Sequence, residues 1–117
     1  MAELEKLKQT NYQEGHDEGD ELLRQASRSL SAAFRSGDVV ARIGGDEFAI
    51  LLPGIDAGMA EKAKQRIIDN IQMLNTTRRG KPLQISMGVN TAEKGDSLVE
   101  ALKVADERMY TDKLSKR

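Results

Sequence analysis

Two short apolar runs separated by a pair of glycines constrain the fold of this chain more than any other feature. Residues 39–43 read Val-Val-Ala-Arg-Ile and residues 48–52 read Phe-Ala-Ile-Leu-Leu, with Gly44 and Gly45 between them. Such runs predict a β-hairpin, because glycine supplies the positive φ angles of tight turns at little cost. The second run is apolar on both alternating faces, which indicates a central strand covered on both sides.

Helical periodicity precedes and follows this hairpin. Apolar residues recur at helical spacing over residues 21–34, over residues 58–74 and again after Ser97, which predicts three helices. Asp20 is placed to cap the first of them, and Asp96 or Ser97 is placed to cap the last.

The remaining segments complete the outline of an α+β domain. Residues 83–89 alternate between apolar and polar and predict a third strand. Residues 1–10 suggest a short helix, while residues 11–20 and 75–82 are polar and predict loops. This order of elements predicts helices packed on a largely antiparallel central sheet.

Length and composition narrow the class of protein. The 117 residues, with a formal net charge of -1 and no cysteine, fit a single domain over residues 1–117 with no second domain. A chain without a basic face gives no case for nucleic-acid binding, and disulfides and thiolate metal sites are excluded. No apolar run is long enough to cross a bilayer, so we expect a cytoplasmic protein that makes no contact with a membrane.

Two adjacent carboxylates, Asp46 and Glu47, lie in the predicted hairpin turn. Folding does not require this pair, and a divalent cation such as Mg²⁺ would offset the mutual repulsion of the two charges. The preceding Gly44 and Gly45 would let a ligand approach the backbone closely. Composition alone favours a simpler interpretation, a solvated turn, because Asp and Gly are ordinary hairpin residues.

Residues 42–48, Arg-Ile-Gly-Gly-Asp-Glu-Phe, resemble the signature that names the GGDEF family, the diguanylate cyclases. Further matches to motifs of that family follow its order along the chain: Lys8 with Asn11, Gly15 with His16, Gly19 with Asp20, Ser86-Met87-Gly88, and Ala105-Asp106, Met109-Tyr110 and Lys113. Together they span most of the chain from about residue 7 onward. The resemblance implies the palm-like fold of nucleotide cyclases.

The resemblance also implies an activity. A diguanylate cyclase condenses two molecules of GTP into cyclic di-GMP and releases pyrophosphate, with two domains facing each other as a homodimer. Two Mg²⁺ ions are expected at each GTP site. Asp46 matches the metal ligand of the signature turn, and Glu47 matches a neighbouring acid with a metal-binding or general-base role.

Substrate contacts follow from the same resemblance. Asn11 and Asp20 match the pair of residues that recognises guanine, and Lys113 and Arg117 match positions that hold triphosphate oxygens. Without the resemblance, basic residues at the end of a helix are commonplace for dipole reasons. His16, the only histidine, is expected to belong to a structural loop.

A product site is expected upstream of the signature. Arg35 and Asp38 fit an RxxD motif through which many cyclases bind cyclic di-GMP and shut down, and Arg66 matches an arginine that completes such a site. A guanidinium group can clamp phosphate or guanine acceptors, and a carboxylate can accept from guanine donors.

The chain departs from the family pattern at its beginning. The resemblance implies a first strand carrying a metal-binding aspartate, and residues 1–6 match neither, so we expect that strand to be missing and the domain to be partial. Tyr12 also replaces an aspartate of the family. A lost central strand would expose sheet edges and favour domain swapping. Two alternatives to the enzyme therefore stand: an inactive receptor for cyclic di-GMP or GTP, and a nonfunctional fragment.

Overall fold

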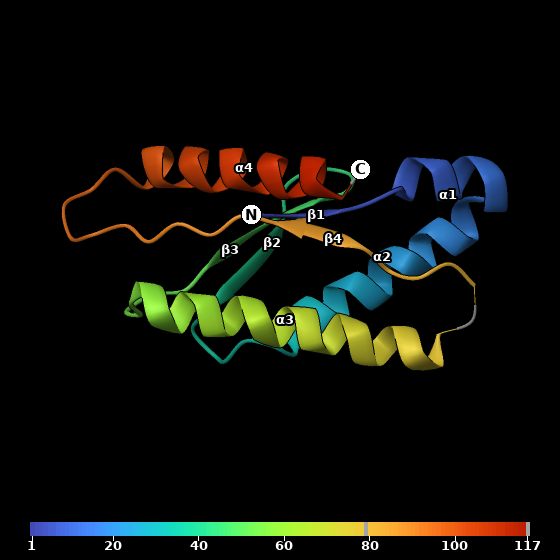
Figure 1. Cartoon of the computed structure of the whole chain (residues 1–117), viewed down its shortest axis with the longest axis horizontal. Helices are drawn as coiled ribbons and strands as arrows, with labels where there is room; N and C mark the ends of the chain where they lie inside the picture. The colour runs from blue at the N-terminus through green and yellow to red at the C-terminus, as the bar shows by residue number, and fades with distance from the viewer. Residues whose placement is uncertain (79, 117) are drawn as a thin grey trace.

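A computed structural model of the chain describes residues 1–78 and 80–116. The strands form one antiparallel sheet in the order β2-β3-β1-β4, which confirms the predicted α+β fold. The elements in chain order (Figure 1) are β1 (Ala2–Leu4), α1 (Leu7–Glu14), α2 (His16–Ser31), β2 (Val39–Arg42), β3 (Glu47–Leu51), α3 (Ala57–Thr77), β4 (Ile85–Met87) and α4 (Leu98–Ser115).

The sheet separates two helical layers. Helices α2 and α3 cover one face and α4 lies along the other, with α1 at one end of the molecule (Figure 1). Side chains alternate between the faces of a strand, so Ala2 and Leu4 of β1 join the core beneath α2 and α3 while Glu3 points to the side of α4. Leu4 and Leu30 are almost fully buried there, and each such leucine contributes about 1.5–3 kcal/mol through burial.

The expectation that the first strand is missing is wrong. Ala2–Leu4 form β1, which lies between β3 and β4 in the middle of the sheet. Ala2 pairs with both Phe48 and Met87, so this strand is held by its neighbours on both sides. A strand of three residues carries almost no periodic pattern of its own, and pairing on both edges decides its conformation.

The polar loop expected over residues 11–20 is helical instead. Helix α1 runs to Glu14 and α2 begins at His16, with Gly15 between them at a φ of 91°. Asp20 therefore lies inside α2 and does not cap it. Since α1 buries only Leu7 and Thr10, its apolar pattern is weak, and its packing against α2 stabilises it.

The other predicted elements are confirmed, with shifted ends. Asp56 caps α3, because its carboxylate accepts from the Met59 N–H at 2.8 Å, and Ser97 caps α4. Strand β4 is shorter than the predicted 83–89. The Asn75 side chain accepts a hydrogen bond from the Leu83 N–H and donates one to the Leu83 carbonyl, so neither backbone group pairs with a strand.

The glycines of the hairpin turn do not have the conformation we expected. Neither Gly44 nor Gly45 adopts a positive φ. A Cβ added to Gly45 would meet no atom within 4 Å, and one added to Gly44 would make only an ordinary contact with Glu47. The fold itself therefore does not require glycine at these positions, and the open space beside them is consistent with approach by a ligand.

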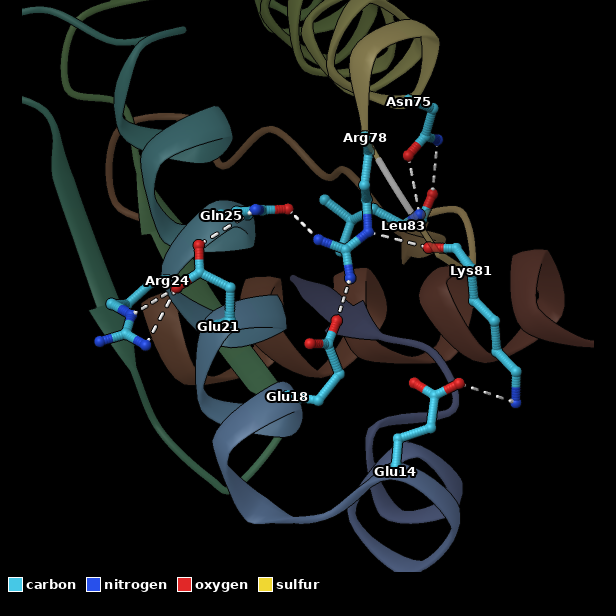
Figure 2. Close-up of polar contacts among 9 residues, drawn as sticks. All are labelled: Glu14, Glu18, Glu21, Arg24, Gln25, Asn75, Arg78, Lys81 and Leu83. Carbon is cyan, nitrogen blue, oxygen red and sulfur yellow. Dashed lines mark hydrogen bonds and ion pairs between the residues drawn. The ribbon is translucent and has the colours of Figure 1, made fainter.

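Arg78 joins the end of α3 to α2 (Figure 2). Its guanidinium donates to Glu18 at 3.0 Å, to the Lys81 carbonyl at 2.8 Å and to the side chain of Gln25. The Arg78 side chain is 4% exposed, whereas that of Glu18 is 38% exposed. These hydrogen bonds of the buried guanidinium hold the α3–β4 connection against α2.

We expect Arg78→Gln to lower the free energy of unfolding by about 1–3 kcal/mol, because the buried Arg78 side chain is replaced and a carbonyl and two side chains lose their donor. Thermal unfolding should record this as a fall in Tm of about 5–15 °C. Arg24→Gln is the matched control, since the Arg24–Glu21 pair is exposed (Figure 2) and such pairs contribute little. Equal losses in the two variants would contradict a special role for Arg78.

Candidate functional site

Three carboxylates meet at the end of the hairpin, beside the centre of the sheet. One oxygen each from Glu3, Asp46 and Glu47 lies within 4.8 Å of the others. Glu3 is the middle residue of β1 and pairs across the sheet with Glu47, the first residue of β3. Asp46 ends the turn that leads into β3, so pairing between β1 and β3 assembles the cluster.

The turn that carries Asp46 is braced from both sides. The Arg42 guanidinium donates to the carbonyls of Gly44 at 3.1 Å and Gly45 at 2.9 Å. On the other side, the Leu4 N–H donates to the Asp46 carbonyl at 2.7 Å. The backbone of the turn is therefore fixed, while the carboxylate of Asp46 remains partly exposed.

Burial, together with the negative charge of the cluster, raises the pKa of the Glu47 carboxyl above its ordinary value. Burial is the largest cause, followed by the negative charges of Glu3, Asp106 and Asp46, while Lys113 opposes them. Because the folded-state pKa exceeds the unfolded-state pKa, ionisation of Glu47 destabilises the fold as pH rises through that range, and the cost persists at neutral pH. A bound cation would offset this cost.

Lys113 of α4 lies beside the cluster. Its Nζ is 2.9 Å from a carboxylate oxygen of Glu3, with side-chain exposures of 26% for Lys113 and 14% for Glu3. The end of α4 is held at the outer edge of β4, where the Met87 N–H donates to Asp112 at 2.8 Å. Burial of Asp112 opposes its ionisation, but this hydrogen bond and Lys116 outweigh it and lower its pKa.

The donor set suits a hard divalent cation. Glu3, Asp46 and Glu47 offer only carboxylate oxygens, the ligands that Mg²⁺ prefers, and all three are partly accessible to solvent. A Mg²⁺ ion also commonly takes ligands from substrate phosphates. The residues present therefore fit such an ion, with Lys113 as a further positive group nearby.

The crossing of α1 and α2 brings together the residues predicted to recognise guanine. A Cβ on Gly19 would lie 1.6 Å from Asn11 Oδ1, so only glycine admits this side chain, and Asp20 follows at an exposed position. Asn11 Oδ1 is buried, and the described residues offer it no hydrogen-bond partner. The guanine-binding role of Asn11 and Asp20 remains a prediction.

The predicted product site gathers around the end of α2. The Asp38 carboxylate accepts from the Arg35 N–H at 3.1 Å, and its other oxygen lies 3.9 Å from the Arg35 guanidinium. Arg66 of α3 donates to the Ala33 carbonyl at 3.3 Å, two residues before Arg35 in sequence. Arg35 and Arg66 are exposed, and their role as a product site stays a prediction.

Sequence reasoning missed one member of the acidic cluster. Glu3 belongs to the alternating run Ala-Glu-Leu-Glu at residues 2–5, whose period of two was the available indication of a strand. Asp106, which acts on the pKa of Glu47, was quoted only as part of a motif. Arg117, predicted to hold triphosphate oxygens, lies outside the described residues.

Across the part of the chain that the structure describes, none of the helices has both the length and the apolar character needed to cross a membrane.

The chain is similar in sequence and in fold to known proteins. The chain is 32% identical over 114 residues to the probable diguanylate cyclase DgcJ of Escherichia coli, covering 97% of this chain and 22% of that protein. Diguanylate cyclase SiaD of Pseudomonas aeruginosa, solved with its activator SiaC, superposes with a TM-score of 0.85 at 29% identity over 97% of this chain and 45% of that one.

The GGDEF domain of DgcB from Caulobacter crescentus, solved in complex with c-di-GMP, gives a TM-score of 0.88 over 99% of this chain and 71% of that one. Its identity of 23% shows the fold alone. The family model described as "Diguanylate cyclase, GGDEF domain" matches residues 1–117. With the acidic cluster formed at the signature turn, this match shows that the chain belongs to the GGDEF family of diguanylate cyclases.

Proposed function

We propose that this domain condenses two molecules of GTP into cyclic di-GMP and pyrophosphate. The observation that carries the proposal is the convergence of Glu3, Asp46 and Glu47 within 4.8 Å at the signature turn. Family membership supports it. In the reaction the 3′-oxygen of each GTP forms a bond to the α-phosphorus of the other, one pyrophosphate leaves from each GTP, and each hydroxyl proton passes to a base.

The three carboxylates are proposed to hold Mg²⁺, two ions at each GTP site, which would supply positive charge to the phosphate oxygens. For Glu47 we propose two alternative roles beside Asp46, metal ligand or acceptor of the hydroxyl proton, and a bound cation would lower its pKa and favour the first. Lys113, whose Nζ lies 2.9 Å from Glu3, is proposed to bring positive charge to the triphosphate. Gly44 and Gly45 leave open space where the nucleotide can approach the turn.

Guanine recognition is proposed at the crossing of α1 and α2. The Asp20 carboxylate can accept from the N1–H and the amino group of guanine, a pair of donors that adenine does not present. Asn11, whose side chain lies against Gly19, the neighbour of Asp20 in sequence, is the second residue proposed to recognise the base. The closure of the second phosphodiester bond needs two GTP-loaded domains face to face, so we propose a homodimer acting in the cytoplasm.

The test is incubation of the purified chain with GTP and Mg²⁺, followed by chromatographic identification of the product. We expect cyclic di-GMP and pyrophosphate, and a fall in rate of at least about 100-fold in Asp46→Ala, because a metal ligand is lost. Asp69→Ala, at an exposed acid of α3, is the matched control and should keep its rate. Turnover that survives Asp46→Ala would disprove the assignment of the metal site.

A second candidate function is a receptor for cyclic di-GMP, in which the dinucleotide binds without turnover. The pairing of Asp38 with Arg35, and the hydrogen bond of Arg66 to the Ala33 carbonyl, favour this site whether or not the domain is active. In an active domain the same site would supply feedback inhibition. Calorimetric binding of cyclic di-GMP that is unchanged in Arg35→Ala would remove this candidate.

A further inference from the structure

Ser86, in the middle of β4, carries a buried hydroxyl group that makes no hydrogen bond. Its side chain is 0% exposed, and the described residues offer its Oγ no hydrogen-bond partner. A buried polar group without a partner destabilises a folded protein, because it has lost its hydrogen bonds to water and gained none in return. The Ser86 hydroxyl is therefore explained best by a state of the domain in which it finds a partner.

Strand pairing places Ser86 directly beside the acidic cluster. Glu3 of β1 pairs with Glu47 on one side and with Ser86 on the other. Residues opposite each other on neighbouring strands point to the same face, so the three side chains form a row across the sheet on the side of α4 (Figure 1). The Cβ atoms of such pairs lie about 4.5–5.5 Å apart, so a glutamate at position 3 can bring its carboxylate to the Ser86 hydroxyl.

Packing explains the small size of Ser86 but not its hydroxyl. Helix α4 lies so close to β4 that a Cβ on Gly88, two residues further along the chain and on the same face, would meet the Ala105 carbonyl oxygen at 2.0 Å. A small side chain is therefore needed at Ser86 as well. Alanine would meet that need without burying a polar group, so the hydroxyl points to a role beyond packing.

In this structure Glu3 accepts from Lys113, not from Ser86. The Lys113 Nζ lies 2.9 Å from Glu3 Oε1, and it comes from the last turns of α4, which the Asp112 carboxylate ties to the Met87 N–H. A cation held by Glu3 would repel the ammonium group of Lys113, and the proposed function assigns that group to the triphosphate. Glu3 would then lose its present donor when it becomes a metal ligand.

We propose that Ser86 is a positioning residue of the metal site, whose hydroxyl donates to the Glu3 carboxylate in place of Lys113 when Glu3 binds Mg²⁺. A carboxylate has two oxygens, so one can face the ion while the other accepts from the hydroxyl. Hydrogen bonds of this kind orient metal-binding carboxylates. The hydroxyl is neutral and, unlike Lys113, does not repel the ion. This inference rests on the proposed function, because it requires the acidic cluster to bind Mg²⁺.

The test is Ser86→Ala, with Tm measured against Mg²⁺ concentration at constant ionic strength. Without Mg²⁺ we expect a Tm equal to that of the parent or higher by about 1–3 °C, because an unpartnered buried hydroxyl is removed. The Kd for Mg²⁺ obtained from the rise in Tm should increase about tenfold. Half-maximal turnover should likewise need about tenfold more Mg²⁺, and the rate should approach that of the parent at saturating Mg²⁺.

Ser29→Ala is the matched control. Ser29 is also buried, at 8% exposed, but it belongs to α2 on the other side of the sheet, so its replacement should leave the Kd for Mg²⁺ unchanged. A Ser86→Ala protein with the Kd of the parent overturns this inference and leaves the proposed function intact. A parent chain whose Tm does not respond to Mg²⁺ overturns the proposed metal site, and this inference with it.

Discussion

Replacing Gly88 with alanine is expected to dislodge α4 from the sheet. A Cβ at this position would lie 2.0 Å from the Ala105 carbonyl oxygen and 2.2 Å from the Met109 nitrogen, both backbone atoms that cannot turn aside. We expect a loss of about 2–4 kcal/mol in the free energy of unfolding and a fall in Tm of roughly 10–20 °C. The same displacement would draw Lys113 away from Glu3 and so disturb the candidate site.

Gly58→Ala is the matched control for this substitution. Gly58 lies in the first turn of α3, where an added Cβ would make only an ordinary contact with Asp56 at 3.4 Å. Alanine in a helix is more favourable than glycine by about 0.5–1 kcal/mol, so this variant should unfold at the same temperature or higher. A Gly88→Ala protein whose Tm lies within about 2 °C of the parent would contradict the close packing of α4 on β4.

Replacing Glu3 with glutamine is expected to abolish the response of the domain to Mg²⁺. In the parent chain a cation bound among the three carboxylates should raise Tm by mass action. Glutamine preserves the size of the side chain but removes one of the three charges that would hold the ion. We therefore expect the Mg²⁺-dependent rise in Tm to disappear and cyclic di-GMP formation to fall by at least about 100-fold.

The control for this prediction is Glu107→Gln, at an exposed position of α4. It changes net charge by the same amount and should leave both the Mg²⁺ response and turnover intact. Because Tm reports Mg²⁺ binding directly, its dependence on Mg²⁺ concentration tests the role of Glu3 even if the parent domain has no catalytic activity. If Glu3→Gln kept the full Mg²⁺-dependent shift, Glu3 would not be a ligand and the acidic cluster would be smaller than we infer.

The parts of the fold that could be predicted are those with a long or strongly patterned sequence. Helices α3 and α4 repeat apolar residues over several turns and carry capping side chains in Asp56 and Ser97, so local chemistry defines them. The hairpin follows from two apolar runs around Gly44 and Gly45, although the φ angles of these glycines are not the reason. Asp46 and Glu47 could be predicted as site residues from the resemblance to the family signature, because composition alone favours a solvated turn.

The parts that could not be predicted depend on partners far away in sequence. Strand β1 is three residues long, and pairing with both β3 and β4 makes it a strand. Helix α1 has a weak apolar pattern, and its contact with α2 stabilises it.

By itself the sequence determined the class of fold, which follows from periodicity, and the family and the acidic turn, which follow from the resemblance of its motifs to those of the GGDEF family. Only the tertiary structure decided that Glu3 joins Asp46 and Glu47 and that Lys113 reaches Glu3 from 110 residues away. The physical reason is the separation along the chain over which each kind of interaction acts. Helical and turn preferences act over a few residues, whereas strand pairing and charge clusters depend on which distant segments the folded chain brings together.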